Sequence, residues 1–371
     1  MAAPSVQTLQ RIADETGHQP GTLEKVLRLL DLLQEIARDP VLSERLVLKG
    51  GTALNVFHLG LDRLSVDIDL NYIGALDRAV METERPTVDA ALNRVLTSQG
   101  YAVRRQPDEH AGGKWLSRYS SALGGNATLE LDVNYMARQL LIGATRMESR
   151  PLGDMRASGV LVLDLHEIVA GKLVALVDRH AARDLFDARR ILSIDGLDWN
   201  LIKAAVLAIG ACGWRDWRTM SVDAIKGDPR ELRQKLAICL PRDRFSGKGD
   251  VDAWIEETVA LCRKSSHSCS ISQRTSGSSS IASWIAARST LICWTWYQQY
   301  VRALAPCRCS PGNVSMLGDI GGWIVKNRGS ATLSAPRTMP RGATLGHGFP
   351  SKVPTARNLK WRRRQKSQAT R

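Results

Sequence analysis

Two aspartates, Asp67 and Asp69, stand two residues apart in segment 66–72, VDIDLNY, where apolar and polar residues alternate. Alternation with a period of two predicts a β-strand, and side chains at positions i and i+2 of a strand share one face. The two carboxylates would therefore lie side by side. Mg²⁺ prefers such oxygen ligands, and two Mg²⁺ ions about 4 Å apart can stabilise the attacking and leaving oxygens of a nucleotidyl transfer. The pattern alone also fits a solvated polar strand face.

A pair of glycines precedes these aspartates. The apolar run 46–48 predicts a buried strand, and Gly50 and Gly51 predict a tight turn that leads into a helix over about 52–59. Backbone N–H groups at the start of a helix bind anions, and the Thr52 hydroxyl could add a donor. Alone, the glycines would predict only a turn. Followed by two aspartates, they predict a phosphate-binding site.

A third carboxylate is expected on another strand. Segment 128–135, TLELDVNY, alternates again and places Glu130 and Asp132 on one face. Asp132 lies between two apolar residues, and we prefer it to Glu130 as the third metal ligand.

A helix is predicted from Leu165 to His180, with Asp164 as its N-cap and Glu167 completing a capping box. Lys172 lies beside the apolar stripe of this helix. Its ammonium group could reach a triphosphate, or it could extend to solvent.

A second helix is predicted from about 183 to 192. Asp184 lies in its first turn and could orient Lys172 or a substrate hydroxyl. Arg183 and Asp187 are expected to form structural ion pairs, together with Arg179 at the helix junction.

The remaining pattern defines the expected architecture. Helices are predicted over 21–38, 86–98 (with Pro86 at its start), 198–210, 228–240 and 251–263, and a strand over 101–105. We therefore expect an α/β fold with a mixed sheet and flanking helices, followed by a helical domain. The predicted domains are residues 1–155 with the leading helix, 156–263, and a basic tail, 264–371.

The tail has an unusual composition. The formal charge of the chain is +14, but residues 264–371 contain 17 Lys and Arg and one acid, Asp319, which leaves residues 1–263 near neutral. Five Trp and four Cys also lie there, although disordered tails are poor in both. We hypothesise that the reading frame shifts near residue 264 or that the segment is disordered; the alternative is a genuine basic tail.

Other classes of protein are disfavoured. The seven cysteines form no CxxC pair, no signal peptide is apparent, and no apolar run is long enough for a membrane helix. The sequence predicts a cytoplasmic protein.

Segments 46–70 (LVLKGGTALNVFHLGLDRLSVDIDL), 129–135 (LELDVNY) and 167–192 (EIVAGKLVALVDRHAARDLFDARRIL) resemble, in that order, the motifs of the AbiEii/AbiGii toxin family. This family belongs to the polymerase-β-like nucleotidyltransferases. The resemblance covers about residues 8–240. It is lost after about residue 263, and Thr52 stands where many members of the superfamily have Ser.

The resemblance implies a toxin of a two-gene toxin–antitoxin or phage-defence system. Such a toxin would use Mg²⁺ to transfer a nucleotide from an NTP to RNA, with the 3′ end of tRNA as the expected acceptor. The antitoxin would be encoded by a neighbouring gene, and no stable complex between the two proteins is expected. The residue roles that carry over are metal binding and catalysis by Asp67, Asp69 and Asp132; catalysis by Lys172 and Asp184; and nucleotide binding by Gly50, Gly51, Thr52, Arg63, Ser65 and Lys172.

Three alternatives remain open. A relative of this fold could modify a small molecule instead of RNA. The chain could be a nucleic-acid-binding protein without activity, whose basic segment 361–364 contacts phosphates, or it could be a degenerate gene product. The near-neutral body argues against strong RNA affinity, because phosphate contacts need basic side chains.

Overall fold

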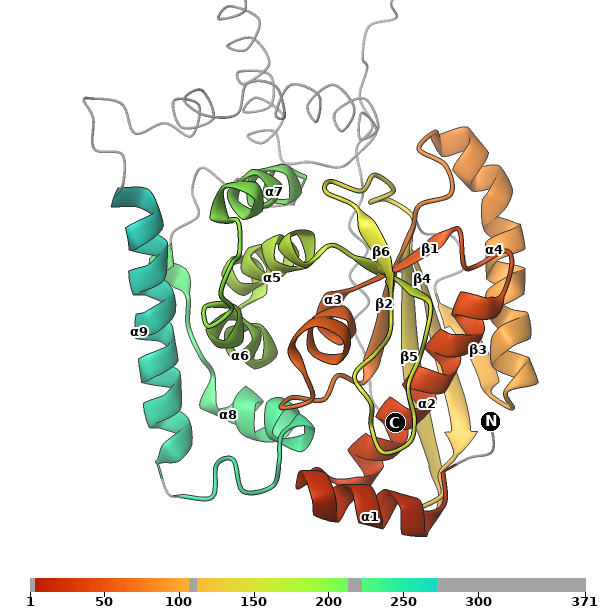
Figure 1. The fold of residues 1–371 in the computed structure, drawn as a ribbon, viewed down its shortest axis with the longest axis horizontal. Coiled ribbons are helices and arrows are strands. Elements are labelled where there is room, and N and C mark those ends of the chain that lie inside the picture. Colours follow the sequence, from red (N-terminus) through yellow and green to blue (C-terminus); the bar gives the residue numbers. More distant parts are fainter. Residues whose placement is uncertain (1–3, 107–111, 213–221, 248, 272–371) are drawn as a thin grey trace, which may run out of the picture. The chain divides into compact units, whose positions relative to one another are not determined.

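The computed structural model describes residues 4–106, 112–212, 222–247 and 249–271, all within one compact unit, Met1–Arg328. In these residues, seven strands form one mixed sheet in the order β3-β4-β5-β2-β1-β7-β6 (Figure 1). The β2–β5 and β1–β7 pairs are parallel, and the other pairs are antiparallel. The strands are β1 (Leu46–Lys49), β2 (Asp67–Tyr72), β3 (Ala102–Gln106), β4 (Gly112–Ser120), β5 (Asn126–Asn134), β6 (Ala144–Met147) and β7 (Val160–Leu163).

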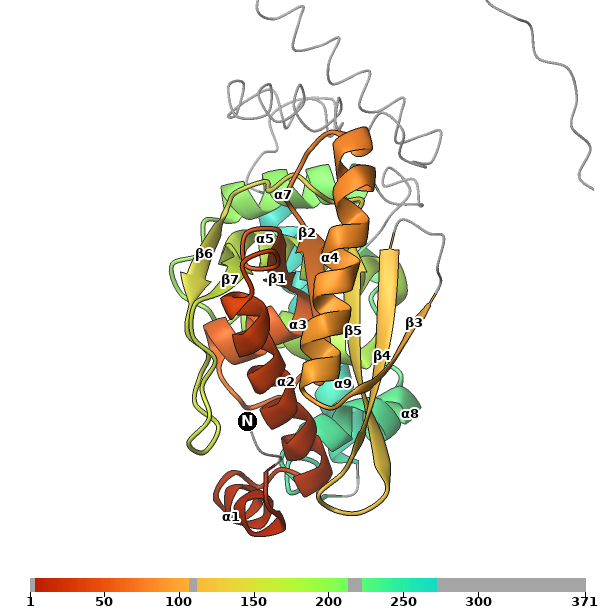
Figure 2. The same cartoon turned by 90° about the vertical axis from the view of Figure 1, so that its right-hand side faces the viewer.

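Helices cover the sheet from two sides. Figures 1 and 2 show α2 (Pro20–Arg38) and α4 (Arg78–Ser98) over one face, with α1 (Val6–Thr16) beside the lower end of α2. The buried side chains of β4 and β5 point toward these helices, and Trp115 Nε1 donates a hydrogen bond of 3.0 Å to Asn93 of α4. The other face carries the short helix α3 (Gly50–Thr52), which continues as a π-helix, Ala53–Leu59.

The helical part begins on the sheet and then builds a core of its own. Its helices are α5 (Leu165–Arg179), α6 (Ala182–Ile191), α7 (Trp199–Ala211), α8 (Pro229–Glu231) and α9 (Asp250–Ile271). Ile168 and Val169 of α5 belong to the core around the sheet. Phe186 and Trp254 belong to a second hydrophobic cluster, with their ring centroids 5.8 Å apart. Because Leu176 of α5 also belongs to this second cluster, α5 connects the two cores.

Several predicted elements are confirmed, and others need correction. The strands at 46–48, 66–72, 101–105 and 128–135 are present within one or two residues, as are the helices at 21–38, 165–180, 183–192, 198–210 and 251–263, although the last of these extends to Ile271. The prediction that a helix starts at Pro86 is wrong, because α4 starts at Arg78, where Asp77 Oδ1 accepts the N–H of Val80. Pro86 lacks an N–H, but it lies on a partly exposed part of the helix, where water can bind the unpaired carbonyl.

Two further predictions are corrected by the structure. The segment 228–240 forms α8, a π-helical turn at Leu232–Leu236 and a 3₁₀ turn at Ala237–Cys239 instead of one helix. Asp164 caps α5 as expected, but Glu167 does not complete a capping box. Its carboxylate accepts N–H groups of Leu141 and Ile142, both at 3.0 Å, and ties the loop before β6 to α5.

The division into domains remains a prediction. β7 follows the proposed boundary at residue 155 and pairs with both β1 and β6. The tail hypothesis also stays a prediction, since residues 272–371 lie outside the described part. Within the described part, no helix is both long and apolar enough to cross a membrane.

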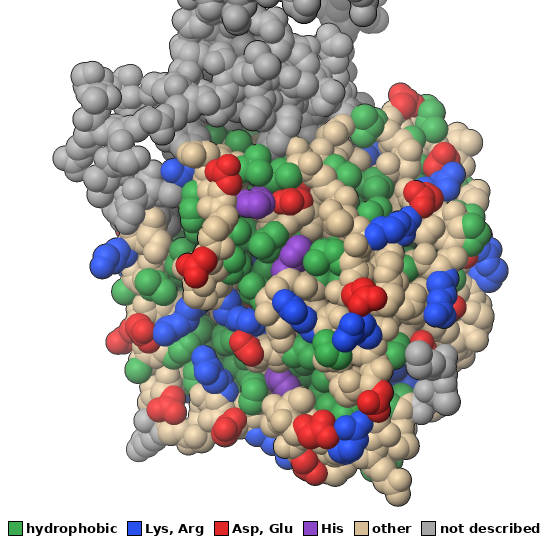
Figure 3. Space-filling model, viewed as in Figure 1, with side chains coloured by type: hydrophobic (Ala, Val, Ile, Leu, Met, Phe, Trp, Pro, Cys, Tyr) green, Lys and Arg blue, Asp and Glu red, His purple; other side chains and the backbone are tan. Residues whose placement is uncertain are grey.

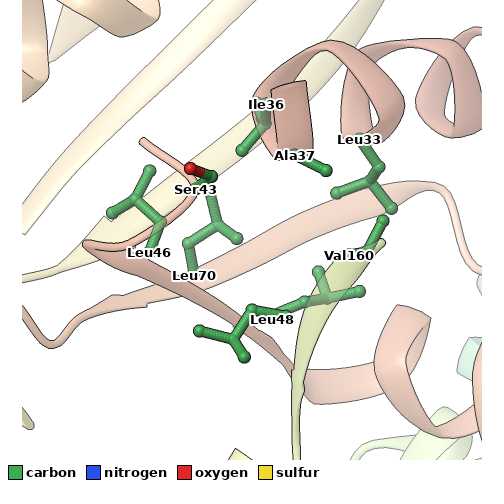
Figure 4. Close-up of a pocket in the computed structure, with 9 residues that line it drawn as sticks. Leu33, Ile36, Ala37, Ser43, Leu46, Leu48, Leu70 and Val160 are labelled. Carbon is green, nitrogen blue, oxygen red and sulfur yellow. The ribbon is translucent and has the colours of Figure 1, made fainter. Parts of the chain in front are cut away.

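A small apolar hollow lies between α2 and the sheet (Figure 4). Leu33 and Ile36 of α2 face Leu48, Leu70 and Val160 across it. No charged side chain lines it, so it belongs to the hydrophobic core and offers no chemistry.

Candidate active site

The paired strands β2 and β5 bring the predicted carboxylates together. In their parallel register, Asp67 lies opposite Glu130 and Asp69 lies opposite Asp132. Paired residues of neighbouring strands point to the same face of a sheet. The intervening residue Ile68 is buried on the α4 side, so the carboxylates occupy the opposite face. Asp67 is 33% exposed and Asp132 is 45% exposed, so both can meet a ligand.

The pKa of Asp132 depends on its burial and on the charges around it. Burial raises the pKa of Asp132, and the nearby charges of Asp69, Glu130 and Asp67 raise it further against the effect of Lys114. Lys114 of β4 places its Nζ 2.5 Å from Glu130 Oε2 and 3.9 Å from Asp132 Oδ2. Glu130 is therefore already paired with a cation, whereas Asp132 has the weaker contact.

The residues present fit a divalent cation. The side chains of Asp67, Asp69 and Asp132 supply the hard oxygen ligands that Mg²⁺ prefers. Among the described residues, no three His, Cys, Asp or Glu side chains converge into a preformed metal cage. Mg²⁺ does not require one, because it usually takes one or two carboxylates and completes its shell with phosphate oxygens and water.

The glycine turn lies against these carboxylates. Gly50 has φ +74°, and a Cβ at this position would overlap the carboxylate of Asp69. A Cβ at Gly51 would lie 3.0 Å from both Arg63 Nη2 and Ser65 Oγ, and 3.6 Å from Lys172 Nζ. The two glycines therefore allow the backbone to pass between the carboxylates and the lysine, as a phosphate-binding turn requires.

Thr52 and Arg63 use their donors within the protein. The buried Thr52 hydroxyl donates to the carbonyl of Asp67 at 2.5 Å, which fixes β2 against the glycine turn. Arg63 donates from Nε and Nη2 to the two oxygens of Asp187 at 2.9 and 3.0 Å. Both side chains support the site in this structure. Their predicted contacts with a nucleotide, and that of the buried Ser65, stay predictions.

Lys172 is held by two buried aspartates of α6. Its Nζ lies 2.7 Å from Asp187 Oδ2 and 3.4 Å from Asp184 Oδ1, and neither aspartate is exposed to solvent. Burial opposes ionisation of Asp187, but the neighbouring Arg63 and Lys172 outweigh it and lower its pKa to about 2. Arg179 donates to Asp184 at 2.6 and 2.9 Å, and the pKa of Asp184 is also lowered despite its burial.

Asp187 is more central than the sequence indicated. It joins Arg63, Lys172 and Asn55, so it connects α6 and α5 with the π-helix after the glycine turn and with the loop before β2. The sequence offered one signal, because Asp184 and Asp187 are three residues apart and share a helix face. Only the tertiary structure shows which cations they meet.

Arg183 crosses from α6 to the carboxylates. Its Nη1 lies 3.1 Å from Asp67 Oδ2, and its side chain is 50% exposed. The sequence pattern predicts only a structural ion pair for this arginine. The structure places it at the entrance of the site, in contact with a predicted metal ligand.

The fold and this arrangement of groups define a nucleotidyltransferase. The structure is similar to MenT4, a nucleotidyltransferase toxin from Mycobacterium tuberculosis, with 17% sequence identity and a TM-score of 0.50, over 81% of this chain and 98% of that one. The chain belongs to the AbiEii family, described as nucleotidyl transferase AbiEii toxins of type IV toxin–antitoxin systems, whose sequence model matches residues 31–243.

One more solved structure and a search of curated proteins were compared with this chain. The structure of JHP933 from Helicobacter pylori matches with 18% identity and a TM-score of 0.43, over 69% of this chain and 97% of that one. A search of curated proteins found no match. The family model confirms the predicted family, and the likeness to MenT4 confirms the predicted fold class.

Proposed function

We propose that this toxin transfers a nucleotide from an NTP to an RNA acceptor, with the 3′ end of tRNA as the specific target, in a Mg²⁺-dependent reaction. The observation that carries the proposal is the register that sets Asp69 beside Asp132, directly next to Gly50. Carboxylates and a phosphate-binding turn are thereby within reach of the same triphosphate. Such a reaction would act in the cytoplasm, within a toxin–antitoxin or phage-defence system.

The triphosphate would lie on the glycine turn. The backbone at Gly51 passes close to Lys172, since a Cβ there would lie 3.6 Å from Nζ, and this ammonium group would supply positive charge to the phosphates. Asp67, Asp69 and Asp132 would hold Mg²⁺, which supplies charge neutralisation on the transferred phosphorus and the leaving pyrophosphate. Asp184 and Asp187 contact the ammonium group of Lys172 from α6 and set its position, so we assign them positioning roles.

Asp132 is the residue best placed to receive the proton of the attacking hydroxyl. It lies at the outer side of the carboxylate group, one strand farther from the glycine turn than Asp69. Burial and the neighbouring carboxylates raise its pKa when no cation is bound, whereas a bound Mg²⁺ would lower it, so the assignment as general base depends on its position.

Arg183 would contribute at the entrance. Its exposed guanidinium group contacts Asp67 and can turn from this carboxylate to an incoming phosphate. Arginine suits this role because its planar fork binds phosphate oxygens in pairs.

Incubation of the full-length protein with radiolabelled NTPs, Mg²⁺ and total cellular RNA tests the proposal. We expect label in tRNA with the native protein and none with Asp69→Asn. Asp154→Asn is a matched control, because this aspartate is 99% exposed and pairs with Arg11 of α1, which is not a residue of the site. Label that appears only in a small-molecule fraction would instead support the alternative acceptor class.

The toxin role has a separate test. Expression of the full chain should arrest growth, and co-expression of the neighbouring antitoxin gene should restore it without a co-purifying complex. Growth arrest that persists with Asp69→Asn would separate toxicity from nucleotidyl transfer.

A further inference from the structure

The sheet face that carries the site carboxylates continues beyond them. Lys114 of β4 lies opposite Asp132, and Arg104 of β3 lies opposite Leu116, two residues farther along β4. Because residues two apart on a strand share a face, Arg118 belongs to the same face. Arg104, Lys114 and Arg118 are called the basic strand face below.

The basic strand face is open, whereas the reverse side of these strands is not. Trp115 and Tyr119 alternate with the basic residues and are buried toward α2 and α4. Arg104 and Arg118 are exposed, and Lys114 is 41% exposed. The sequence therefore places the basic residues of β4 on the one sheet face that leads into the active site.

The three cations have a regular spacing. The β3–β4 register places Arg104 diagonally between Lys114 and Arg118, and such diagonal neighbours lie about 7–8 Å apart. Along β4, Lys114 and Arg118 are four residues apart, or about 14 Å. This geometry suits successive phosphates of an extended polynucleotide, with one cation for each phosphate.

The in-line geometry of the reaction also places the acceptor on the basic strand face. In an in-line displacement, the attacking oxygen and the leaving pyrophosphate lie on opposite sides of the transferred phosphorus. The leaving group belongs at the Gly51 and Lys172 side, next to β1. The acceptor must then arrive from the opposite side of Asp69 and Asp132, which is the side of β4 and β3.

Other parts of the surface offer no comparable track in the view of Figure 3. Basic and acidic side chains of the described residues are intermixed over the helices that face the reader there. Lys114 contacts Glu130 and Asp132, and the exposed Arg104 and Arg118 continue the same sheet face along β3 and β4. A small-molecule acceptor would not need such an extension.

We propose that the basic strand face binds backbone phosphates of a single-stranded nucleic-acid acceptor and directs its 3′ end toward Asp132. The inference rests on the proposed function and specifies how the acceptor is held. It also answers the objection that residues 1–263 are near neutral, because two exposed arginines beside the site can make a local contact while Lys114 stays paired with Glu130.

The test compares two double charge reversals in the full-length protein. Arg104→Glu with Arg118→Glu changes the basic strand face. Arg38→Glu with Arg78→Glu is the control, since these arginines of α2 and α4 are 66% and 62% exposed and lie in the other helix layer. Both variants have the same net charge and keep the basic segment 264–371, so non-specific attraction is matched.

Binding of a single-stranded RNA ending in the tRNA 3′ sequence is measured by fluorescence anisotropy at several salt concentrations. Each lost phosphate contact lowers the slope of log K against log salt by about 0.7 for a single strand, so the strand-face variant should lose roughly 1.4. Its KM for RNA should rise at least tenfold, and its KM for NTP should not change. The control variant should match the native protein in all three quantities.

The possible outcomes separate this inference from the proposed function. If the native protein labels RNA and the strand-face variant matches the control, the basic strand face is not the acceptor site, although the function stands. If the strand-face variant loses affinity for NTP and not for RNA, the basic strand face binds the triphosphate and the inference is wrong. If the native protein labels no RNA, the proposed acceptor itself fails. Arg104→Gln with Arg118→Gln repeats the test should the reversals impair folding.

Discussion

The ammonium group of Lys172 lies 2.7 Å from the fully buried carboxylate of Asp187, which also binds Arg63 through both oxygens. This contact joins α5, α6 and the loop before β2 behind the glycine turn. A carboxylate that holds two buried cations fixes the position of each, so the geometry of the proposed phosphate-binding side depends on one aspartate.

Replacement of Asp187 by Ala should therefore cost much stability. It leaves Arg63 and Lys172 as buried charges without their shared partner, and loss of one member of a buried pair typically costs about 3–5 kcal/mol. Urea unfolding measures the change. Asp62→Ala is the comparison, because this 75% exposed aspartate pairs with Arg190, and exposed pairs contribute less than about 1 kcal/mol. Equal losses in the two variants would contradict the assigned role.

Replacement of Asp132 by Asn should lower kcat by about 10²–10⁴-fold, the usual contribution of a general base. Glu130→Gln should have a much smaller effect, because Lys114 already pairs with Glu130 at 2.5 Å. Steady-state kinetics in Mg²⁺ with an RNA acceptor distinguish the two carboxylates. A larger defect in Glu130→Gln would identify Glu130 as the third functional carboxylate.

Replacement of Gly50 by Ala should abolish transfer. The added Cβ would overlap the Asp69 carboxylate, and the positive φ adds about 1–2 kcal/mol of strain for any residue with a Cβ. Gly100→Ala is a matched control, since Gly100 has φ +82° and a Cβ added there would meet no other atom within 4 Å. Both variants should lose stability in thermal melts through the backbone strain, but Gly100→Ala should remain active. An active Gly50→Ala protein would show that the glycine turn tolerates a side chain.

Glu167 should make the protein less stable as the pH rises. Burial raises its pKa to about 7 despite the N–H groups it accepts, so between its ordinary pKa of 4.5 and about 7 the folded state binds more protons than the unfolded state. The stabilising contribution is complete below pH 4.5 and is lost by about pH 7, which amounts to about 3 kcal/mol.

Glu167→Gln, a neutral side chain of the same shape, tests this linkage. It can still accept the N–H groups of Leu141 and Ile142, and the free energy of unfolding should then vary less between pH 4.5 and 7. Chemical denaturation at several pH values provides the measurement. An unchanged pH profile would show that Glu167 titrates normally.

The sequence alone determined which residues form the strands that carry the candidate carboxylates. The alternation around Asp67 and Asp132 required both aspartates to face away from the core, because a shift of one residue would bury the charges. The Gly50–Gly51 pair marked the turn, since few other residues adopt its backbone conformation. These are local properties, so local patterns sufficed.

Only the tertiary structure decided what these elements meet. No pattern within β2 or β5 states that Asp69 pairs with Asp132 in parallel register, or that Lys172 meets Asp187 rather than solvent. The strand β4 was not predicted from its sequence, and its proposed role in acceptor binding follows only from its place beside β5. Contacts between distant segments depend on how the sheet and the helix layers pack against each other. A local sequence pattern does not determine this packing.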